Sequence, residues 1–195
     1  GQGDAHRPLL RDLPVAGVIL AGLVWGLYNA ALAMVFTFGA VVLMAGGWSL
    51  GQAAGMVSAF MIALTLAIPA GGGIADRTSR RDAVIASGTA GFVLAMAALL
   101  ATPGWWIAPL MVLAGVLYAL PAGPIMTLPA AVLSPQTRAL GMGVFFTIYY
   151  GVMMAAPAIG GAAAERAGTP AAAILLGGAM AGAALLALVL FRAVA

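Results

Sequence analysis

The feature that most constrains this sequence is a long stretch of chain without any charge. No charged side chain occurs between Asp12 and Asp76, and most of the residues between them are apolar. Soluble domains carry roughly a quarter charged residues, whereas 7% of these 195 residues are charged and 64% are hydrophobic. The sequence therefore predicts a chain that lies in a lipid bilayer. It excludes a soluble enzyme, a disordered tail and a coiled coil.

Six apolar segments are long enough to cross a membrane, since one helix needs about 20 apolar residues to do so. They are continuous rather than alternating, which favours helices over the strands of a barrel. We expect an all-α domain over residues 13–195, preceded by a polar cytoplasmic tail or linker at residues 1–12. Its spans are predicted at residues 13–43, 52–70, 83–100, 106–127, 138–159 and 171–191.

Turn residues separate these spans. Gly46-Gly47 is predicted to end the first span, and Ser49 to cap the second. The Thr102-Pro103-Gly104 segment divides the third span from the fourth. Ser134-Pro135 is expected to supply the N-cap and first helical residue of the fifth span. Glycines at 71–73 are expected to give the chain a sharp exit from the second span.

Prolines within the spans predict bends. Pro121 and Pro124 stand near the end of the fourth span with Pro129 beyond them, and Pro157 lies in the fifth. A helical proline lacks an N–H group and so frees a carbonyl of the preceding turn. In a membrane such a carbonyl is tolerated only where protein or water satisfies it. We therefore expect a bend or gate at these prolines.

The arginines indicate how the chain is oriented. A cytoplasmic N-terminus puts seven of them on the cytoplasmic side and only Arg166 on the other: Arg7, Arg11, Arg77, Arg80, Arg81, Arg138 and Arg192. Arginine in short loops marks the cytoplasmic face. Trp48, Trp105 and Trp106 then fall at the opposite interface. We expect both termini in the cytoplasm and a place in a cell membrane of the bacterial inner-membrane type, without a cleavable signal peptide.

The residues that most chemistry requires are scarce. There is no cysteine, and the one histidine, His6, lies in the tail. No span contains an acid, base or metal cluster, so we expect no enzyme, no catalytic residue, no metal and no cofactor. The arginines are scattered singly, so no nucleic-acid partner is expected.

The loop after the second span carries a motif. Residues 72–84 read GGIADRTSRRDAV, which resembles the loop signature G-x-L-a-D-r-x-G-r-k-x-x-l of the major facilitator superfamily. Five residues match in register: Gly72, Asp76, Arg77, Arg80 and Arg81. Ile74 and Val84 are conservative matches, and Ser79 stands where the family prefers glycine.

The resemblance implies a twelve-helix secondary transporter with two six-helix halves around a cavity, of which this chain is one half. The family's loop carboxylate docks against the opposite half and steadies one access state, a gating role that falls on Asp76. N-terminal halves of the family often carry an arginine in the fourth span, which has no charge here, so we expect this chain to be the C-terminal half. The segment Ala156–Gly161 is close to the fifth-helix pattern G-P-x-x-G-G of family antiporters, which favours the N-terminal half. Expected partners are a small solute, membrane lipids, and the missing half or a second copy.

Two spans carry candidates for the solute cavity. Trp25, Asn29, Leu32 and Phe36 share one face of the first span, with Asn29 near its middle. Asn29 is either a solute or gating contact or an interhelical hydrogen bond. Aromatic side chains on the fifth span either pack or contact solute. The candidates are Trp25, Tyr28, Asn29, Phe36, Phe146, Tyr149, Tyr150 and Met153. A non-transporting scaffold that retains the family fold is the alternative function.

Overall fold

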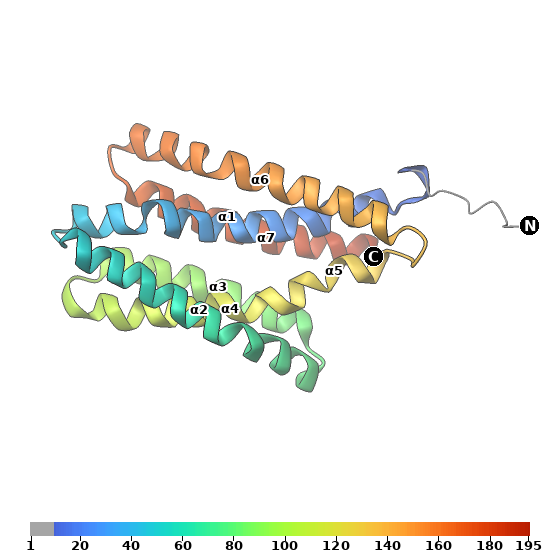
Figure 1. Cartoon of the computed structure of the whole chain (residues 1–195), viewed down its shortest axis with the longest axis horizontal. Coiled ribbons are helices and arrows are strands. Elements are labelled where there is room, and N and C mark those ends of the chain that lie inside the picture. Colours follow the sequence, from blue (N-terminus) through green and yellow to red (C-terminus); the bar gives the residue numbers. More distant parts are fainter. Residues whose placement is uncertain (1–9) are drawn as a thin grey trace, which may run out of the picture.

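The computed structural model describes residues 10–195, and this part of the chain contains helices and no strand (Figure 1). A short helix η1 (Leu10–Asp12) leads into α1 (Val15–Ala45), α2 (Leu50–Thr78) and α3 (Arg81–Ala101). There follow η2 (Gly104–Trp106), α4 (Ile107–Met126), α5 (Leu128–Val132), α6 (Arg138–Ala167) and α7 (Ala171–Val194). Six helical segments are long and apolar enough to cross a membrane, with η2, α4 and α5 forming one of them. The predicted all-helical fold with six spans is confirmed; His6 and Arg7 lie outside the described residues.

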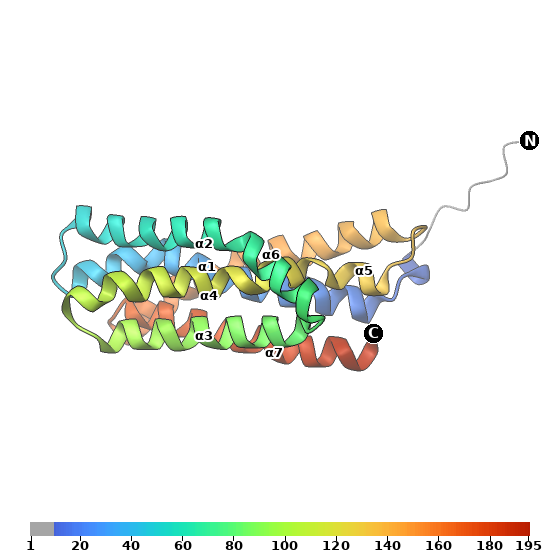
Figure 2. The ribbon, with the colours of Figure 1, turned by 90° about the horizontal axis from the view of Figure 1, so that it is seen from below.

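The helices form three layers. Helices α1 and α4 lie in the middle, α2 and α6 along one side, and α3 and α7 along the other (Figure 2). In the most apolar window of each helix, 61% of the residues are buried in α1 but only 17% in α2 and in α6. The core therefore lies around α1 and α4, while α2 and α6 leave most of their apolar surface uncovered.

The first three and the last three spans interlock. Helix α1 packs mainly on α6 and α7, and α4 packs mainly on α2 and α3. Each set of three therefore builds its core mainly with the other set, an arrangement seen in transporters made of repeats.

Glycines bring these helices into close contact. A Cβ atom on Gly115 of α4 would lie 2.3 Å from the carbonyl oxygen of Phe60 on α2. On α1, Gly22 and Gly26 meet the Ile148 and Val152 side chains of α6. Small residues at such crossings are typical of membrane helices, because association there depends on close backbone packing.

One predicted helix end and one predicted helix cap are wrong. The chain does not leave α2 at glycines 71–73; the helix continues to Thr78 and ends with Ser79 in the left-handed region (φ 54°). In lipid an unbroken helix satisfies its own backbone groups. The fifth span begins at Arg138, as predicted, but Ser134 and Pro135 are not its N-cap and first residue, since Ser134 and Thr137 lie in a turn before the helix and share a 3.0 Å hydroxyl–hydroxyl bond. Ser49 does cap α2, in a capping box with Gln52.

The proline-containing part of α4 lies close to a glycine of α2. The helix runs through Pro121 and Pro124 to Met126 and is interrupted at Thr127, before α5. Pro124 leaves the carbonyl of Leu120 without its intrahelical donor. That oxygen would lie 2.2 Å from a Cβ atom on Gly71 of α2, so the absence of a side chain there is what lets α2 approach. Pro157 lies inside α6, which is unbroken.

Candidate functional site

Aromatic residues of α1 and α6 meet on the side of the molecule where α2 and α6 lie. The Trp25 ring lies 6.1 Å from that of Tyr149, and Tyr149 lies 4.7 Å from Tyr150 and 6.3 Å from Phe146 (centroid distances). We call this surface the central face and define it by partly or fully exposed residues: Trp25, Asn29, Leu32, Phe36, Phe146, Tyr149, Tyr150 and Met153. Its residues are those expected from sequence, with Leu32 added and Tyr28 removed.

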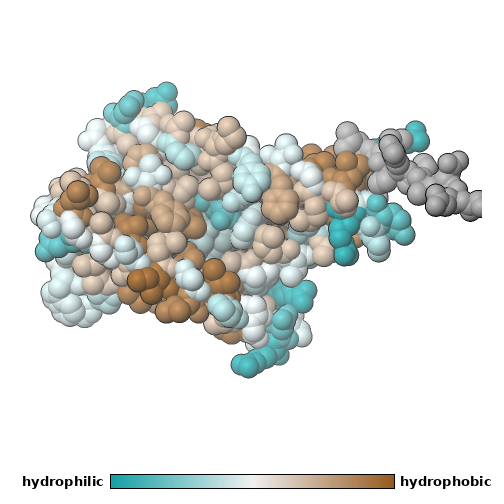
Figure 3. All heavy atoms as spheres, viewed as in Figure 1, coloured by the Kyte–Doolittle hydropathy of each residue, from teal (hydrophilic) through white to brown (hydrophobic). Residues whose placement is uncertain are grey.

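The central face extends along the helix axis. Trp25 and Phe36 are eleven residues apart on α1, which corresponds to about 16 Å at the helical rise per residue. Figure 3 shows the molecule from this side: the most strongly hydrophilic residues lie mainly at its two ends, and apolar or weakly polar surface fills much of the length between them. The central face therefore lies at the depth of the hydrocarbon.

Asn29 is the amide near the middle of the first span. Its Nδ2 donates a 2.8 Å hydrogen bond to the carbonyl of Trp25. Its Oδ1 lies 3.5 Å from the hydroxyl of Tyr118 on α4. This interhelical contact shares the single hydroxyl hydrogen of Tyr118 with the main-chain carbonyl of Tyr28, and the part-exposed Asn29 side chain is also part of the central face, so the structure is compatible with both roles that the sequence left open.

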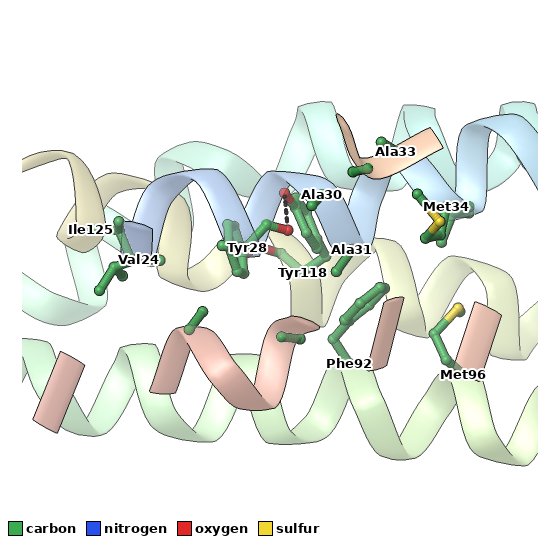
Figure 4. Packing of buried hydrophobic residues seen from close by; sticks show 14 of the residues in the cluster. Val24, Tyr28, Ala30, Ala31, Ala33, Met34, Phe92, Met96, Tyr118 and Ile125 are labelled. Carbon is green, nitrogen blue, oxygen red and sulfur yellow. Dashed lines mark hydrogen bonds between the residues drawn. The ribbon is translucent and has the colours of Figure 1, made fainter. Parts of the chain in front are cut away.

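Tyr28 lies behind the central face, in the core. Its ring stacks on that of Tyr118, with centroids 4.3 Å apart and planes 12° from parallel (Figure 4). The Tyr28 hydroxyl donates to the main-chain carbonyl of Tyr118, and the Tyr118 hydroxyl donates to that of Tyr28 at 3.3 Å. Both side chains are buried, so Tyr28 is a helix-packing residue rather than part of the exposed surface.

Sequence reasoning missed Tyr118. Its ring links the Tyr28 stack to Phe92 of α3, at a centroid distance of 5.1 Å, and to Phe60 of α2, at 6.4 Å. The one available signal was a phenol in the middle of an otherwise apolar span, which requires a hydrogen-bond partner. No spacing rule connects it to Tyr28, which lies 90 residues away.

The motif residues lie at the end of the bundle that carries most of the arginines. We call this end, with Arg77, Arg80, Arg81, Arg138 and Arg192, the arginine end; the opposite one, with Trp48, Trp105 and Trp106, is the tryptophan end (Figure 1). Gly72, Asp76 and Arg77 belong to the last turns of α2. Nη2 of Arg81 contacts Oδ1 of Asp76 at 3.2 Å, and both side chains are exposed. Asp76 is thus held at the surface rather than in the core.

A second ion pair lies close to the motif. Arg192, near the end of α7, binds both oxygens of Asp82 in the first turn of α3, at 2.6 and 2.9 Å. This bidentate contact joins the two helices of the layer opposite α2 and α6.

Among residues 10–195, no group of three His, Cys, Asp or Glu side chains is placed to hold a metal ion. The central face offers aromatic surface, one amide and two phenols. Such a surface is suited to stacking and a few directional hydrogen bonds.

The family model for the Major Facilitator Superfamily matches residues 15–195, which takes in all six spans. The chain belongs to the Major Facilitator Superfamily. Members of this superfamily are transporters and not enzymes, so the match supports a transporter-type function and a multi-pass membrane protein. A comparison with curated proteins gives no match.

Proposed function

We propose that this chain is one six-helix half of a secondary transporter that moves a small solute by alternating access. It rocks against a second six-helix body, either the missing half of a longer permease or a second copy of itself. The arginine end faces the cytoplasm of a bacterial-type cell, and the membrane is the inner membrane.

The observation that carries this proposal is the uneven burial of the helices. Helices α2 and α6 bury only 17% of their apolar windows, against 61% for α1. Helix α6 contributes four residues of the central face, α2 lies in the same layer, and the face contains Asn29, the amide near mid-span. A second body resting on α2 and α6 encloses that face near the bilayer midplane, where transporters of this kind bind their solutes.

The chemistry of the central face defines the class of solute. Trp25 and Tyr149 offer stacking surfaces, and the Tyr149 and Tyr150 hydroxyls and the Asn29 amide offer hydrogen bonds. The central face has no charged side chain. A solute with an apolar or aromatic body and a small polar group fits this surface best.

Alternating access can be tested without knowing the solute, because the chain contains no cysteine. A Leu32→Cys variant places one thiol on the central face near mid-span. A membrane-impermeant methanethiosulfonate reagent is added to one side of sealed vesicles of known orientation, and then to the other. The proposal predicts modification from both sides.

The matched control is Leu94→Cys on α3, in the layer opposite α2 and α6, where the native side chain is 70% exposed. This thiol faces lipid and is expected to resist the reagent from either side. Modification of Leu32→Cys from one side only, or from neither, contradicts alternating access.

A further inference from the structure

A hollow of about 360 Å³ opens at the arginine end between three distant parts of the chain. Arg81 lines it from the start of α3 and Arg192 from near the end of α7. The opposite wall is the α4–α5 junction, with Thr127, Leu128, Ala130 and Ala131. Figure 1 shows α5 and the C-terminal end of α7 near one another at this end of the molecule.

The two arginines are held in place by partners outside the lining of the hollow. Asp82 binds Nε and Nη2 of Arg192, whose guanidinium carbon lies 5.4 Å from the ring centroid of Phe191. Phe191 is buried, so it provides a fixed support. Arg81 is held by one contact to Asp76. The Arg192 guanidinium is therefore oriented before any ligand arrives, while that of Arg81 is kept near the hollow by one exposed contact.

These contacts leave hydrogen-bond donors free to bind a ligand. A guanidinium has five N–H donors. Asp82 accepts two from Arg192 and Asp76 accepts one from Arg81, and both arginine side chains are about half-exposed. This region contains four arginines (77, 80, 81 and 192) and two aspartates (76 and 82), so its net charge is positive. An anion with several acceptor oxygens fits this environment.

The other wall has a different chemistry. Leu128, Ala130 and Ala131 are apolar, and the hydroxyl of Thr127 already donates to the carbonyl of Pro124 at 2.7 Å. Donors therefore line one side of the hollow and hydrocarbon the other. The hollow lies at the end of membrane-spanning helices, the level at which lipid phosphates lie. A ligand that matches all three features has an anionic phosphate joined to an apolar body.

We propose that the hollow is a binding site for the phosphate of an anionic phospholipid, whose glycerol and upper acyl chain lie against α5. The guanidinium groups of Arg81 and Arg192 bind the phosphate oxygens. The site is separate from the central face and does not depend on which solute is carried. A free phosphate offers the same oxygens without the apolar body, so the experiment has to distinguish the two.

The test is native mass spectrometry of the detergent-solubilised full chain, titrated with palmitoyl-oleoyl phosphatidylglycerol or with the matching phosphatidylcholine. We expect phosphatidylglycerol to bind about tenfold more tightly, and the double variant Arg81→Gln/Arg192→Gln to lose about tenfold of that affinity. Ala131→Trp, which fills the hollow without changing a charge, weakens binding as well. The Ala131→Trp variant therefore tests the proposal even if the double variant fails to fold.

The matched control is Arg77→Gln/Arg138→Gln, which removes the same charge from the same end without touching the lining. It is expected to bind phosphatidylglycerol within about twofold of the parent chain. An equal loss in this control means general attraction to a basic surface and overturns the proposal. Equal binding of phosphatidylcholine, or displacement of the lipid by an equal concentration of inorganic phosphate, overturns it too.

Discussion

Tyr28 of α1 and Tyr118 of α4 clasp one another across the centre of the bundle, each hydroxyl donating to the other's main-chain carbonyl. The clasp joins the first helix of one three-helix set to the first helix of the other. Because α1 and α4 form the middle layer, the clasp fixes the two helices against which all the others pack.

Removing either hydroxyl should have a small, measurable effect. Tyr28→Phe or Tyr118→Phe keeps the stacked rings and loses one interhelical hydrogen bond, which is worth about 0.6 kcal/mol on average in membrane proteins. Tyr28→Ala also removes a fully buried ring and should cost about 3–5 kcal/mol. The measurement is unfolding in mixed detergent micelles.

The control for the clasp is Tyr150→Phe, since Tyr150 is exposed on α6. It should leave the free energy of unfolding unchanged. A cost equal to that of Tyr28→Phe means that the clasp has no special place in stability.

Gly71 should tolerate no side chain, because a Cβ atom there would lie 2.2 Å from the carbonyl oxygen of Leu120 and 2.6 Å from its Cα. Gly71→Ala has to push α2 away from α4, at an expected cost of about 1–3 kcal/mol. Gly73→Ala is the matched control, two residues along the same helix, where a Cβ meets nothing within 4 Å.

Gly73→Ala should be neutral or stabilising by up to about 1 kcal/mol, since alanine has the higher helix propensity. The measurement is the melting temperature of each variant, determined by thermal unfolding under the same conditions. Similar melting temperatures for both would contradict the close packing of α2 on α4.

Asp76→Asn tests the gating role expected from the motif. The change keeps the shape of the side chain but weakens its contact with Arg81 and with any group on a second body. Bilayer insertion should be intact, while the rates of Leu32→Cys modification from the two sides change in opposite directions. Unchanged rates from both sides would mean that Asp76 has no part in the choice of access state.

Much of the fold follows from the sequence because a bilayer restricts what a chain can do. Length and hydropathy alone give six helices in order, and Ser49 with Gln52 marks the start of α2. The exit predicted at glycines 71–73 is wrong in part because the role of Gly71 is tertiary: it allows the contact with Leu120, which only the packed structure contains.

The site was predictable in part. Helical spacing places Trp25 and Asn29 on one face of α1, as observed, but it gives no partner for either residue. Tyr28 precedes Asn29 by one residue, and the turn of about 100° per residue carries its ring into the core. The hollow at Arg81 and Arg192 joins residues 111 positions apart, and no pattern in the sequence connects them.

The central claim is that a second six-helix body covers α2 and α6, and photo-crosslinking in the membrane tests it most directly. The photoreactive residue p-benzoylphenylalanine replaces Leu66 on α2 or Met154 on α6, whose side chains are 76% and 82% exposed. The same residue at Leu94 on α3 or Leu186 on α7, 70% and 68% exposed, reports on the other side. The account predicts protein adducts from the first two positions and lipid adducts from the last two. Lipid adducts from all four positions would contradict it.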